Sequence, residues 1–264
     1  MYEKNRRVGR DAAAGAAAEE TEGQLEGRNA LQEALKSGRT VDKVFIAAGE
    51  IDRGLQRLAA EAKEAGAVVV PVDRRKLDAM SFTHAHQGVI AQAAAHVYYS
   101  IDDILEEAAS RGEAPLLVIC DELSDPHNLG AILRSAECAG AHGVIIPKRR
   151  SVGLTATVAK ASAGAVEYIK VARVTNISAA IGELKEKGVW VFGTAAEGSI
   201  PMYQADLSGP TAIVIGNEGA GLSQLVRKNC DVMVNIPMRG RISSLNASAA
   251  ASILLYEALR QRLG

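Results

Sequence analysis

The sequence predicts an α/β protein of two units, of which the larger contains a parallel sheet with helices on both faces. Short, continuous apolar runs alternate with helical segments over residues 115–264, as is typical of strands that are buried on both faces of a parallel sheet. A shorter alternation over residues 24–96 describes a compact α/β unit of its own. A chain of 264 residues with 48% hydrophobic content can bury a sizeable core in each unit.

The chain is expected to begin with a disordered tail, residues 1–23, which is rich in Ala, Glu and Gly. In the unit that follows, periodicity predicts helices 28–37 and 52–65 and strands 44–46, 68–70 and 88–94. His84 and His86 precede the last of these strands and are expected to be solvated polar residues. No third ligand stands near them, so a metal site is not expected there.

Residues 97–114 are expected to be a linker, because a short acidic helix, 101–111, is followed by Gly112 and Pro115. The second unit, residues 115–264, then alternates strands with helices. The expected strands are 116–120, 144–146, 168–171, 190–193, 212–215 and 232–236. The expected helices are 129–139, 155–161, 177–187 and 245–262.

Composition excludes several classes of protein. The net charge of −1 argues against a uniformly basic nucleic-acid binder, although local basic patches can act without changing the total. The three cysteines, Cys120, Cys138 and Cys230, lie too far apart for a disulfide framework or a zinc site, and they suggest buried thiols of a cytosolic protein. No signal peptide and no run of eighteen apolar residues is present, so we expect a cytoplasmic protein that does not span a membrane.

The chemistry is expected where two apolar strands end. Strand 212–215 runs into a glycine-rich turn, 216–221, which brings bare backbone amides to a ligand. Strand 232–236 runs into residues 237–248, where the last helix begins. In open parallel sheets, ligands bind beyond the carboxyl ends of the strands, so the two strand ends and the helix start predict one binding site.

A nicotinamide dehydrogenase is a poor interpretation of these glycines. A dinucleotide-binding fold would place Gly-x-Gly-x-x-Gly after the first strand of the unit, and that strand instead exits into a polar loop, residues 121–128. The cluster of Gly216, Gly219 and Gly221 has a different spacing and comes late in the sheet.

Asn128 and Arg134 follow this polar loop and have two interpretations each. Six helical steps place them about 120° apart around a helix axis, so Asn128 is better placed as the N-cap. Arg134 would then lean over Gly130, which has no side chain and leaves room for a bound group. The alternative is that Asn128 only caps the helix and that Arg134 pairs with Glu137 on a wet surface.

The glycine turn and the last helix carry three further candidates. Glu218, between glycines, is either a turn residue exposed to water or an acceptor for a ligand. Ser243 or Ser244 is the expected N-cap of the final helix, which leaves Asn246 unexplained. The small residues at 247–252 suit either a tight ligand pocket or a seam of self-association.

In order along the chain, these residues resemble the three motifs of the SpoU/TrmH family, RNA ribose 2′-O-methyltransferases of the SPOUT superfamily. The motifs are Asn128-x5-Arg134, then Ile213-x-Ile215-Gly216-Asn217-Glu218-Gly219-x-Gly221-Leu222, then Ile236-Pro237-Met238 with Ser244-Leu245-Asn246-x-Ser248. Three ordered motifs over residues 121–252 are highly specific. Residues 24–96, with Gly27-Arg28-Asn29 and His86-Gln87-Gly88, also resemble the ribosomal-protein-like substrate-binding domain of the large-subunit rRNA guanosine methyltransferases.

The resemblance implies a fold and a cofactor. The family's parallel sheet ends in a deep trefoil knot, which generic topology rules exclude and which nothing in the strand pattern shows. S-adenosylmethionine is expected in that knot, with its adenine held by backbone groups. The residues implied are Gly216, Gly219, Ile236, Met238 and Leu245, which offer glycines and an apolar wall.

The implied reaction is attack of a ribose 2′-hydroxyl on the methyl carbon of a sulfonium, with no metal. Family assignment puts Arg134 nearest that hydroxyl. A guanidinium is effectively always protonated, so we expect Arg134 to clamp an adjacent phosphate and stabilise the developing alkoxide rather than act as a base. The remaining catalytic candidates are Asn128, which positions Arg134, and Glu218, Ser244 and Asn246.

The implied partners are RNA and a second copy of the chain. The N-terminal unit favours 23S rRNA over tRNA, with a guanosine as the expected target, and a homodimer is expected through residues 115–264. A catalytically silent RNA-binding or ribosome-assembly protein on the same fold stays open as the alternative. Basic residues of the N-terminal unit are either RNA contacts or a solvated face: Arg28, Arg39, Lys43, Arg53, Arg57, Lys63 and 74–76.

Overall fold

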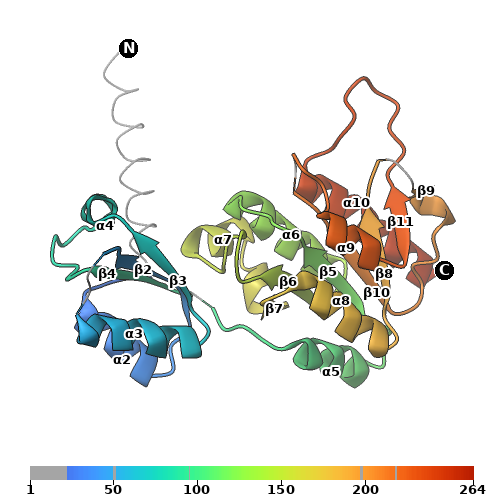
Figure 1. Cartoon of the computed structure of the whole chain (residues 1–264). Helices are drawn as coiled ribbons and strands as arrows, with labels where there is room; N and C mark the ends of the chain where they lie inside the picture. The colour runs from blue at the N-terminus through green and yellow to red at the C-terminus, as the bar shows by residue number, and fades with distance from the viewer. Residues whose placement is uncertain (1–22, 50–51, 95, 197–198, 218) are drawn as a thin grey trace, which may run out of the picture. The chain divides into compact units, whose positions relative to one another are not determined.

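The computed structural model describes residues 23–49, 52–94, 96–196, 199–217 and 219–264 (Figure 1). The main division of the chain falls between Val97 and Tyr98 and separates two compact units. Almost all of the expected tail lies outside the described residues. Within the described part of the chain, no helix is both long and apolar enough to cross a membrane.

The N-terminal unit is a four-stranded mixed sheet with helices on both faces (Figure 1). In the order β1-β4-β2-β3, β2 and β3 are parallel, and β4 runs antiparallel to β1 and β2. The strands are β1 (Gln24–Glu26), β2 (Val41–Ala47), β3 (Val68–Val72) and β4 (Val89–Ala93). The helices are α2 (Arg28–Lys36), α3 (Arg53–Glu64) and α4 (Arg74–Met80).

Alternation along β2 assigns its side chains to two cores. Val44 and Ile46 join Leu31 of α2 and Leu55 of α3 on one face. Phe45 packs on the other face, against Leu77 of α4. The predicted apolar stripe of α3 is confirmed, because Leu55, Leu58 and Ala62 are all buried. Side chains alternate across a strand while a helix buries one stripe, so three helices are needed to cover this sheet.

The C-terminal unit is built on seven strands, every pair of which is parallel, in the order β7-β6-β5-β10-β8-β11-β9. The predicted parallel sheet is confirmed. The strands are β5 (Leu116–Cys120), β6 (Gly143–Pro147), β7 (Lys170–Val174), β8 (Trp190–Thr194), β9 (Ile200–Pro201), β10 (Thr211–Ile215) and β11 (Val232–Asn235). All five residues of β5, β6 and β10 are buried, as expected for strands covered on both faces.

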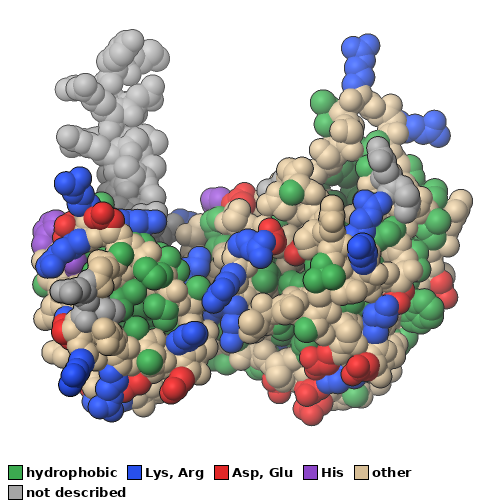
Figure 2. All heavy atoms as spheres, viewed as in Figure 1, with side chains coloured by type: hydrophobic (Ala, Val, Ile, Leu, Met, Phe, Trp, Pro, Cys, Tyr) green, Lys and Arg blue, Asp and Glu red, His purple; other side chains and the backbone are tan. Residues whose placement is uncertain are grey.

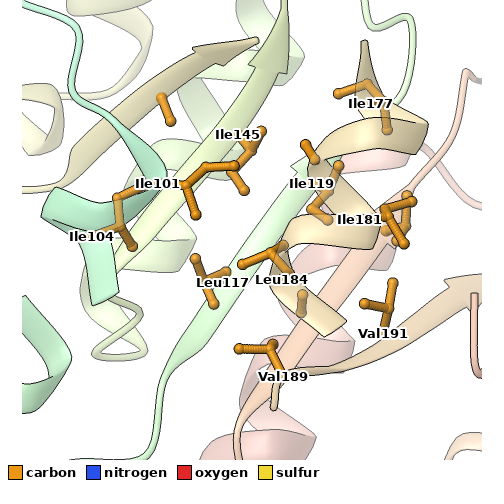
Figure 3. Packing of buried hydrophobic residues seen from close by; sticks show 14 of the residues in the cluster. Ile101, Ile104, Leu117, Ile119, Ile145, Ile177, Ile181, Leu184, Val189 and Val191 are labelled. Atoms are coloured by element: carbon orange, nitrogen blue, oxygen red, sulfur yellow. The ribbon is translucent and has the colours of Figure 1, made fainter. Parts of the chain in front are cut away.

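The helices of this unit are α5 (Ile101–Arg111), α6 (Pro126–Cys138), α7 (Ala156–Ala161), α8 (Ile177–Glu186), α9 (Gln224–Asn229) and α10 (Ala247–Leu263), with short 3₁₀ turns η1 (Ala165–Glu167) and η2 (Met202–Gln204). Helices α5 and α8 share one core with the sheet (Figure 3), and Val226 of α9 is buried in the same core. Helix α6 packs against α10, and the hydroxyls of Ser135 and Ser252 lie 2.7 Å apart between them. The small residues at the start of α10 permit this close approach.

Helix α5 is not part of a linker, contrary to the expectation for residues 97–114. Ile101 and Ile104 are buried in the same core as Leu117 and Ile145 (Figure 3). The helix begins with a capping box between Ser100 and Asp103 and ends at Gly112, whose φ is +67°. Its acidic residues face water while its isoleucines cover the sheet, so polarity concealed its role.

Two predictions about polar residues were also wrong. His86 was expected to be solvated but is 4% exposed: its Nδ1 accepts a hydrogen bond from the Gly88 amide, and its Nε2 lies 2.9 Å from Asp78 Oδ1. His86 therefore holds the turn before β4. Of the three cysteines expected to be buried, Cys138 is exposed.

Candidate active site

The glycine turn after β10 is closed by its own hydrogen bonds. The Asn217 amide donates to the Gly221 carbonyl at 3.0 Å, and the Gly221 amide donates back to the Asn217 carbonyl at 2.8 Å. The Asn217 side chain accepts from the amides of Gly219 and Ala220 at 2.9 and 3.3 Å. Several amides of the turn therefore already have hydrogen-bond partners within the turn, whereas the sequence predicts that they are free to bind a ligand.

Two glycines of the turn have different reasons to be glycine. A Cβ at Gly216 would lie 2.4 Å from the backbone of Gly221, so any side chain there would open the turn. A Cβ at Gly219 would meet only Asn217 Oδ1, at 3.6 Å. Gly216 is thus required by the turn itself, whereas Gly219 leaves space beside the turn.

A cavity of about 740 Å³ lies beside this turn, at the carboxyl ends of β8, β10 and β11. All five residues expected to bind the cofactor line it: Gly216, Gly219, Ile236, Met238 and Leu245. Its wall is mainly apolar, with Ile215, Val234 and Leu254 beside a few polar groups such as Thr194 and Asn235. A concave, mostly apolar pocket with few polar groups is the usual form of a small-molecule site.

The start of α6 differs from the prediction. Asp125, not Asn128, is the N-cap, and its carboxylate accepts from the His127 amide at 2.9 Å. Pro126 occupies the first turn, where its missing N–H does no harm. The Asp-Pro pair is the sequence signal that would have found this start. Asn128 therefore lies inside the helix and is 7% exposed.

Asn128 is held against the start of α10. Nδ2 of Asn246 donates to Oδ1 of Asn128 at 2.8 Å, and Nδ2 of Asn128 donates to Asp125 Oδ2 at 3.1 Å. Asn246 is also the N-cap of α10, because its Oδ1 accepts from the amides of Ser248 and Ala249. The expected cap at Ser243 or Ser244 is therefore wrong, and the amide of Asn246 performs two tasks.

The remaining catalytic candidates are placed differently. Ser244 lines the cavity. Glu218 lies outside the described residues. Arg134 is exposed on α6 and is not among the residues that line the cavity; within the described part of the chain it forms no ion pair with Glu137. The space expected over Gly130 is filled, because a Cβ there would lie 2.4 Å from the Cβ of Ala161.

Sequence reasoning missed two residues that join the loops of this site. Asn217 Nδ2 donates to the Glu122 carbonyl at 3.1 Å and so ties the glycine turn to the loop after β5. Asp121, 4% exposed, accepts from the Ser223 amide at 2.8 Å at the start of α9. Both contacts span long sequence separations, and no local pattern announces them.

The thiol of Cys120, at the end of β5, is held protonated. Burial raises the pKa of Cys120 to about 12, and the neighbouring carboxylate of Asp121 acts in the same direction. A thiolate is the nucleophilic form of cysteine, so Cys120 is not suited to covalent catalysis. Among the described residues, no group of three or more His, Cys, Asp or Glu side chains is arranged to hold a metal.

The sheet, the glycine turn and the lined cavity define an α/β protein with a candidate ligand site at the carboxyl edge of a parallel sheet. Residues 115–256 match the family model described as the SpoU rRNA Methylase family, and residues 24–99 match the model described as RNA 2′-O ribose methyltransferase substrate binding. The chain belongs to the SpoU rRNA methylase family.

Two relatives show how broadly the likeness extends. The chain is 48% identical over 236 residues to a putative TrmH family tRNA/rRNA methyltransferase of Bacillus subtilis, covering 89% of this chain and 94% of that one. It is 44% identical over 225 residues to the 23S rRNA (guanosine-2′-O-)-methyltransferase RlmB of Ralstonia nicotianae, covering 85% of this chain and 89% of that one.

Solved structures agree on the fold. The SpoU methyltransferase AviRb of Streptomyces viridochromogenes, in complex with AdoMet, matches with a TM-score of 0.58 and 27% identity over 91% of this chain and 90% of that one. An AdoMet-bound rRNA methyltransferase of Sinorhizobium meliloti matches with a TM-score of 0.56 and 27% identity over 91% and 88% of the two chains.

Proposed function

We propose that this protein transfers a methyl group from S-adenosylmethionine to a ribose 2′-hydroxyl of RNA, at a guanosine of 23S rRNA. The observation that carries the proposal is the cavity at the carboxyl edge of the sheet, where all five expected cofactor residues meet. The 23S rRNA enzyme of Ralstonia nicotianae, 44% identical, supports the choice of substrate.

The cavity fits the cofactor by shape and polarity. Its apolar wall at Ile236, Met238 and Leu245 suits an adenine ring, and the open side of Gly219 allows close approach to the backbone. Since the amides of Gly219 and Ala220 already bond to Asn217, the hydrogen bonds to adenine fall to backbone groups of residues 236–245. The bound cofactor supplies an electrophilic methyl group on a sulfonium.

The protein's own groups must activate and align the hydroxyl. An alcohol is a poor nucleophile at neutral pH, so its proton must be removed or polarised while the oxygen is held in line with the bond that breaks. Arg134 is assigned to the phosphate beside the target ribose and to the developing alkoxide. Asn128 and Asn246, locked together at 2.8 Å, fix the starts of α6 and α10, and Glu218 and Ser244 complete the set.

The return of the chain end supports a trefoil knot. Helix α10 follows β11, yet it packs on α6, which follows β5, a strand three positions away from β11 in the sheet order β5-β10-β8-β11. The bonds Asn246 to Asn128 and Ser252 to Ser135 join segments more than a hundred residues apart in the sequence. We assign the knot to this crossing of the last segment over the loops after β5 and β10.

RNA binding is assigned to both units. In the N-terminal unit, Arg28 pairs with Asp52 at 2.6 Å and Arg57 with Glu61 at 2.8 Å, so the other basic residues are better suited to phosphates, among them the run at 74–76 at the start of α4. In the C-terminal unit, Lys and Arg side chains stand at the outer end of the loop between β11 and α10 (Figure 2). That loop contains Arg239 and Arg241.

Self-association is proposed through the C-terminal unit. The small residues of α10 are largely used inside the chain: Ala247 and Ala251 are buried, and Ala250 lines the cavity. The surface left for a partner copy is apolar and lies on α10 and η2, where Tyr203, Tyr256 and Leu263 are 64, 51 and 77% exposed. An apolar patch of this kind suits an isologous dimer.

The test is mass-spectrometric mapping of ribose methylation in RNA from cells with and without this protein. We expect one 2′-O-methylguanosine of 23S rRNA to disappear when the protein is absent. Loss from tRNA instead would reassign the substrate, as the name tRNA/rRNA methyltransferase of the Bacillus subtilis relative allows. Unchanged methylation in all RNA would favour a silent RNA-binding protein on the same fold.

A further inference from the structure

The loop between β6 and α7 carries three consecutive basic residues, Lys148, Arg149 and Arg150, which the reaction described above does not use. It leaves the carboxyl end of β6, the strand that pairs with β5. The polar loop that leads to Asn128 leaves the carboxyl end of β5. Because the two strands are parallel neighbours, the basic run lies at the same edge of the sheet as the candidate active site.

Hydrogen bonds hold this basic loop in place at both ends. The Lys148 amide donates to the Val174 carbonyl at 2.8 Å, at the end of β7. The Val152 amide and the Ser151 hydroxyl both donate to the carbonyl of Leu123, at 3.0 and 2.8 Å. Leu123 and Ser151 are 0 and 7% exposed, so the anchor is buried. The loop is therefore fixed to the segment that leads to Asn128.

The described acidic residues of the loop after β5 already have partners. Arg150 pairs with Glu122 at 2.7 Å, an exposed contact that neutralises that carboxylate. Asp121 accepts from the Ser223 amide, and Asp125 accepts from the His127 amide and from Asn128. Among the described residues, Lys148 and Arg149 form no ion pair, and Arg149 is exposed. They are two cations at this edge that remain open to an anion.

We propose that Lys148 and Arg149 form a phosphate-binding site for the RNA strand that carries the target ribose. This inference rests on the proposed function, which brings an RNA backbone to this edge. A methyl transfer to ribose needs the sugar held in line with the cofactor, and the phosphates on either side of it are the natural handles. Two cations on an anchored loop provide such a handle independently of the N-terminal unit.

The test uses the full-length Lys148→Gln/Arg149→Gln variant and 23S rRNA transcribed in vitro. Each phosphate contact with a single strand adds about 0.7 to the slope of log affinity against log salt, so the variant should lose about 1.4 of that slope. The advantage of the wild type in RNA affinity should shrink about sevenfold between 50 and 200 mM salt. At a given salt concentration, the double variant should need a higher RNA concentration than the wild type for half-maximal methylation.

Lys228→Gln is the matched control. Lys228 is exposed at the end of α9, just before β11 starts, and so lies at the opposite edge of the parallel sheet. Its removal should leave the salt slope unchanged, while Arg149→Gln alone should lower it by about 0.7. Titration with S-adenosylmethionine checks that each variant is folded.

The outcomes separate this inference from the proposed function. If the wild type methylates the transcript and the double variant binds it with unchanged affinity and slope, the phosphate site is refuted and the proposed function stands. If Lys228→Gln lowers the slope as much as Arg149→Gln, the effect is general charge and the site is also refuted. A wild type that binds cofactor but neither binds nor methylates the transcript overturns both.

Discussion

Two glycines of the turn, Gly216 and Gly219, both line the cavity but differ in the room each leaves for a side chain. Gly216 has no room for a Cβ, because the backbone of Gly221 lies 2.4 Å from where it would be. Gly219 has room, and it lines the cavity. From sequence both looked alike, since both were read as openings for a ligand. The difference depends on how the turn closes on itself, which is a contact between backbone atoms.

This difference predicts opposite effects of two substitutions. Gly216→Ala should destabilise the C-terminal unit by about 1–3 kcal/mol, the usual effect of forcing atoms into filled space. Gly219→Val should leave the melting temperature near that of the wild type and weaken S-adenosylmethionine binding at least tenfold, because its side chain enters the cavity. Scanning calorimetry and isothermal titration measure the two effects. A Gly219→Val protein that binds the cofactor normally would move the cofactor elsewhere.

His142 predicts how stability depends on pH. Its side chain is fully buried, Nδ1 accepts from the Leu116 amide at 3.0 Å, and Nε2 lies 3.0 Å from Glu113. Burial lowers the pKa of His142 from 6.5, and this outweighs the hydrogen bond to Glu113, which acts in the opposite direction. The unfolded chain therefore takes up a proton that the folded chain resists, so stability is present above about pH 6.5 and is lost as the pH falls below it.

The measurement is urea unfolding between pH 7.5 and 5.5 for the wild type and His142→Leu. The wild type should lose up to about 1.4 kcal/mol per pH unit in this range, the limit for one proton, and the variant should show a flatter profile. Glu26 does not interfere. Burial acts to raise the pKa of Glu26, but hydrogen bonds from Ser81, Thr83 and others outweigh it and lower that pKa from 4.5 to about 2. The stability that Glu26 contributes is therefore lost only below pH 4.5. Equal slopes in the two proteins would contradict the role of His142.

At the scale of elements, the sequence predicts a strand or helix correctly where the element has a clear apolar pattern within its own residues. The buried runs at β5, β6 and β10 have no polar residue to interrupt them, and α3 shows its apolar stripe. The prediction fails where an element is short or its signal is polar. β1 has three residues, and α4 begins with a basic run that resembles a solvated loop. The starts of α6 and α10 were misplaced because several Ser, Asp and Asn residues compete as caps, and tertiary contacts decide among them.

The start of α10 yields a prediction that separates a helix cap from the active site. Asn246→Asp retains an N-cap of equal quality, so its cost in stability should be only that of the lost hydrogen bond to the buried Asn128 Oδ1, about 1–3 kcal/mol. It removes the Nδ2 donor to Asn128, so methyl transfer in a single turnover should fall by more than tenfold. Asn246→Ala should lose both, with a further loss of about 1 kcal/mol. Full activity in Asn246→Asp would show that Asn246 acts only as a cap.

For the whole molecule, the sequence predicts two units, but it assigns helix α5 to a linker between them instead of to the C-terminal unit. An acidic helix before a Gly and a Pro suggested a connection, yet Ile101 and Ile104 of α5 belong to the core of the C-terminal unit (Figure 3). Which unit a helix joins depends on the surface its apolar side chains meet. Ile104 also occupies the space above Gly143, where a Cβ would lie 2.5 Å from it, so β6 and α5 fit each other closely.

The last prediction follows from that boundary and uses two truncations. A fragment of residues 98–264 keeps α5 and should fold and bind S-adenosylmethionine with the affinity of the full chain. A fragment of residues 115–264, the predicted catalytic domain, lacks two isoleucines of the core. Removing a large aliphatic side chain from a core costs about 2–5 kcal/mol, so this fragment should unfold or melt at a far lower temperature than the longer one. Circular dichroism and calorimetry compare the two fragments. If residues 115–264 melt as high as residues 98–264, α5 is a linker after all.

If the longer fragment also loses RNA affinity while it still binds cofactor, the N-terminal unit carries most of the RNA contacts. The salt slope that remains then reports the contacts of the C-terminal unit.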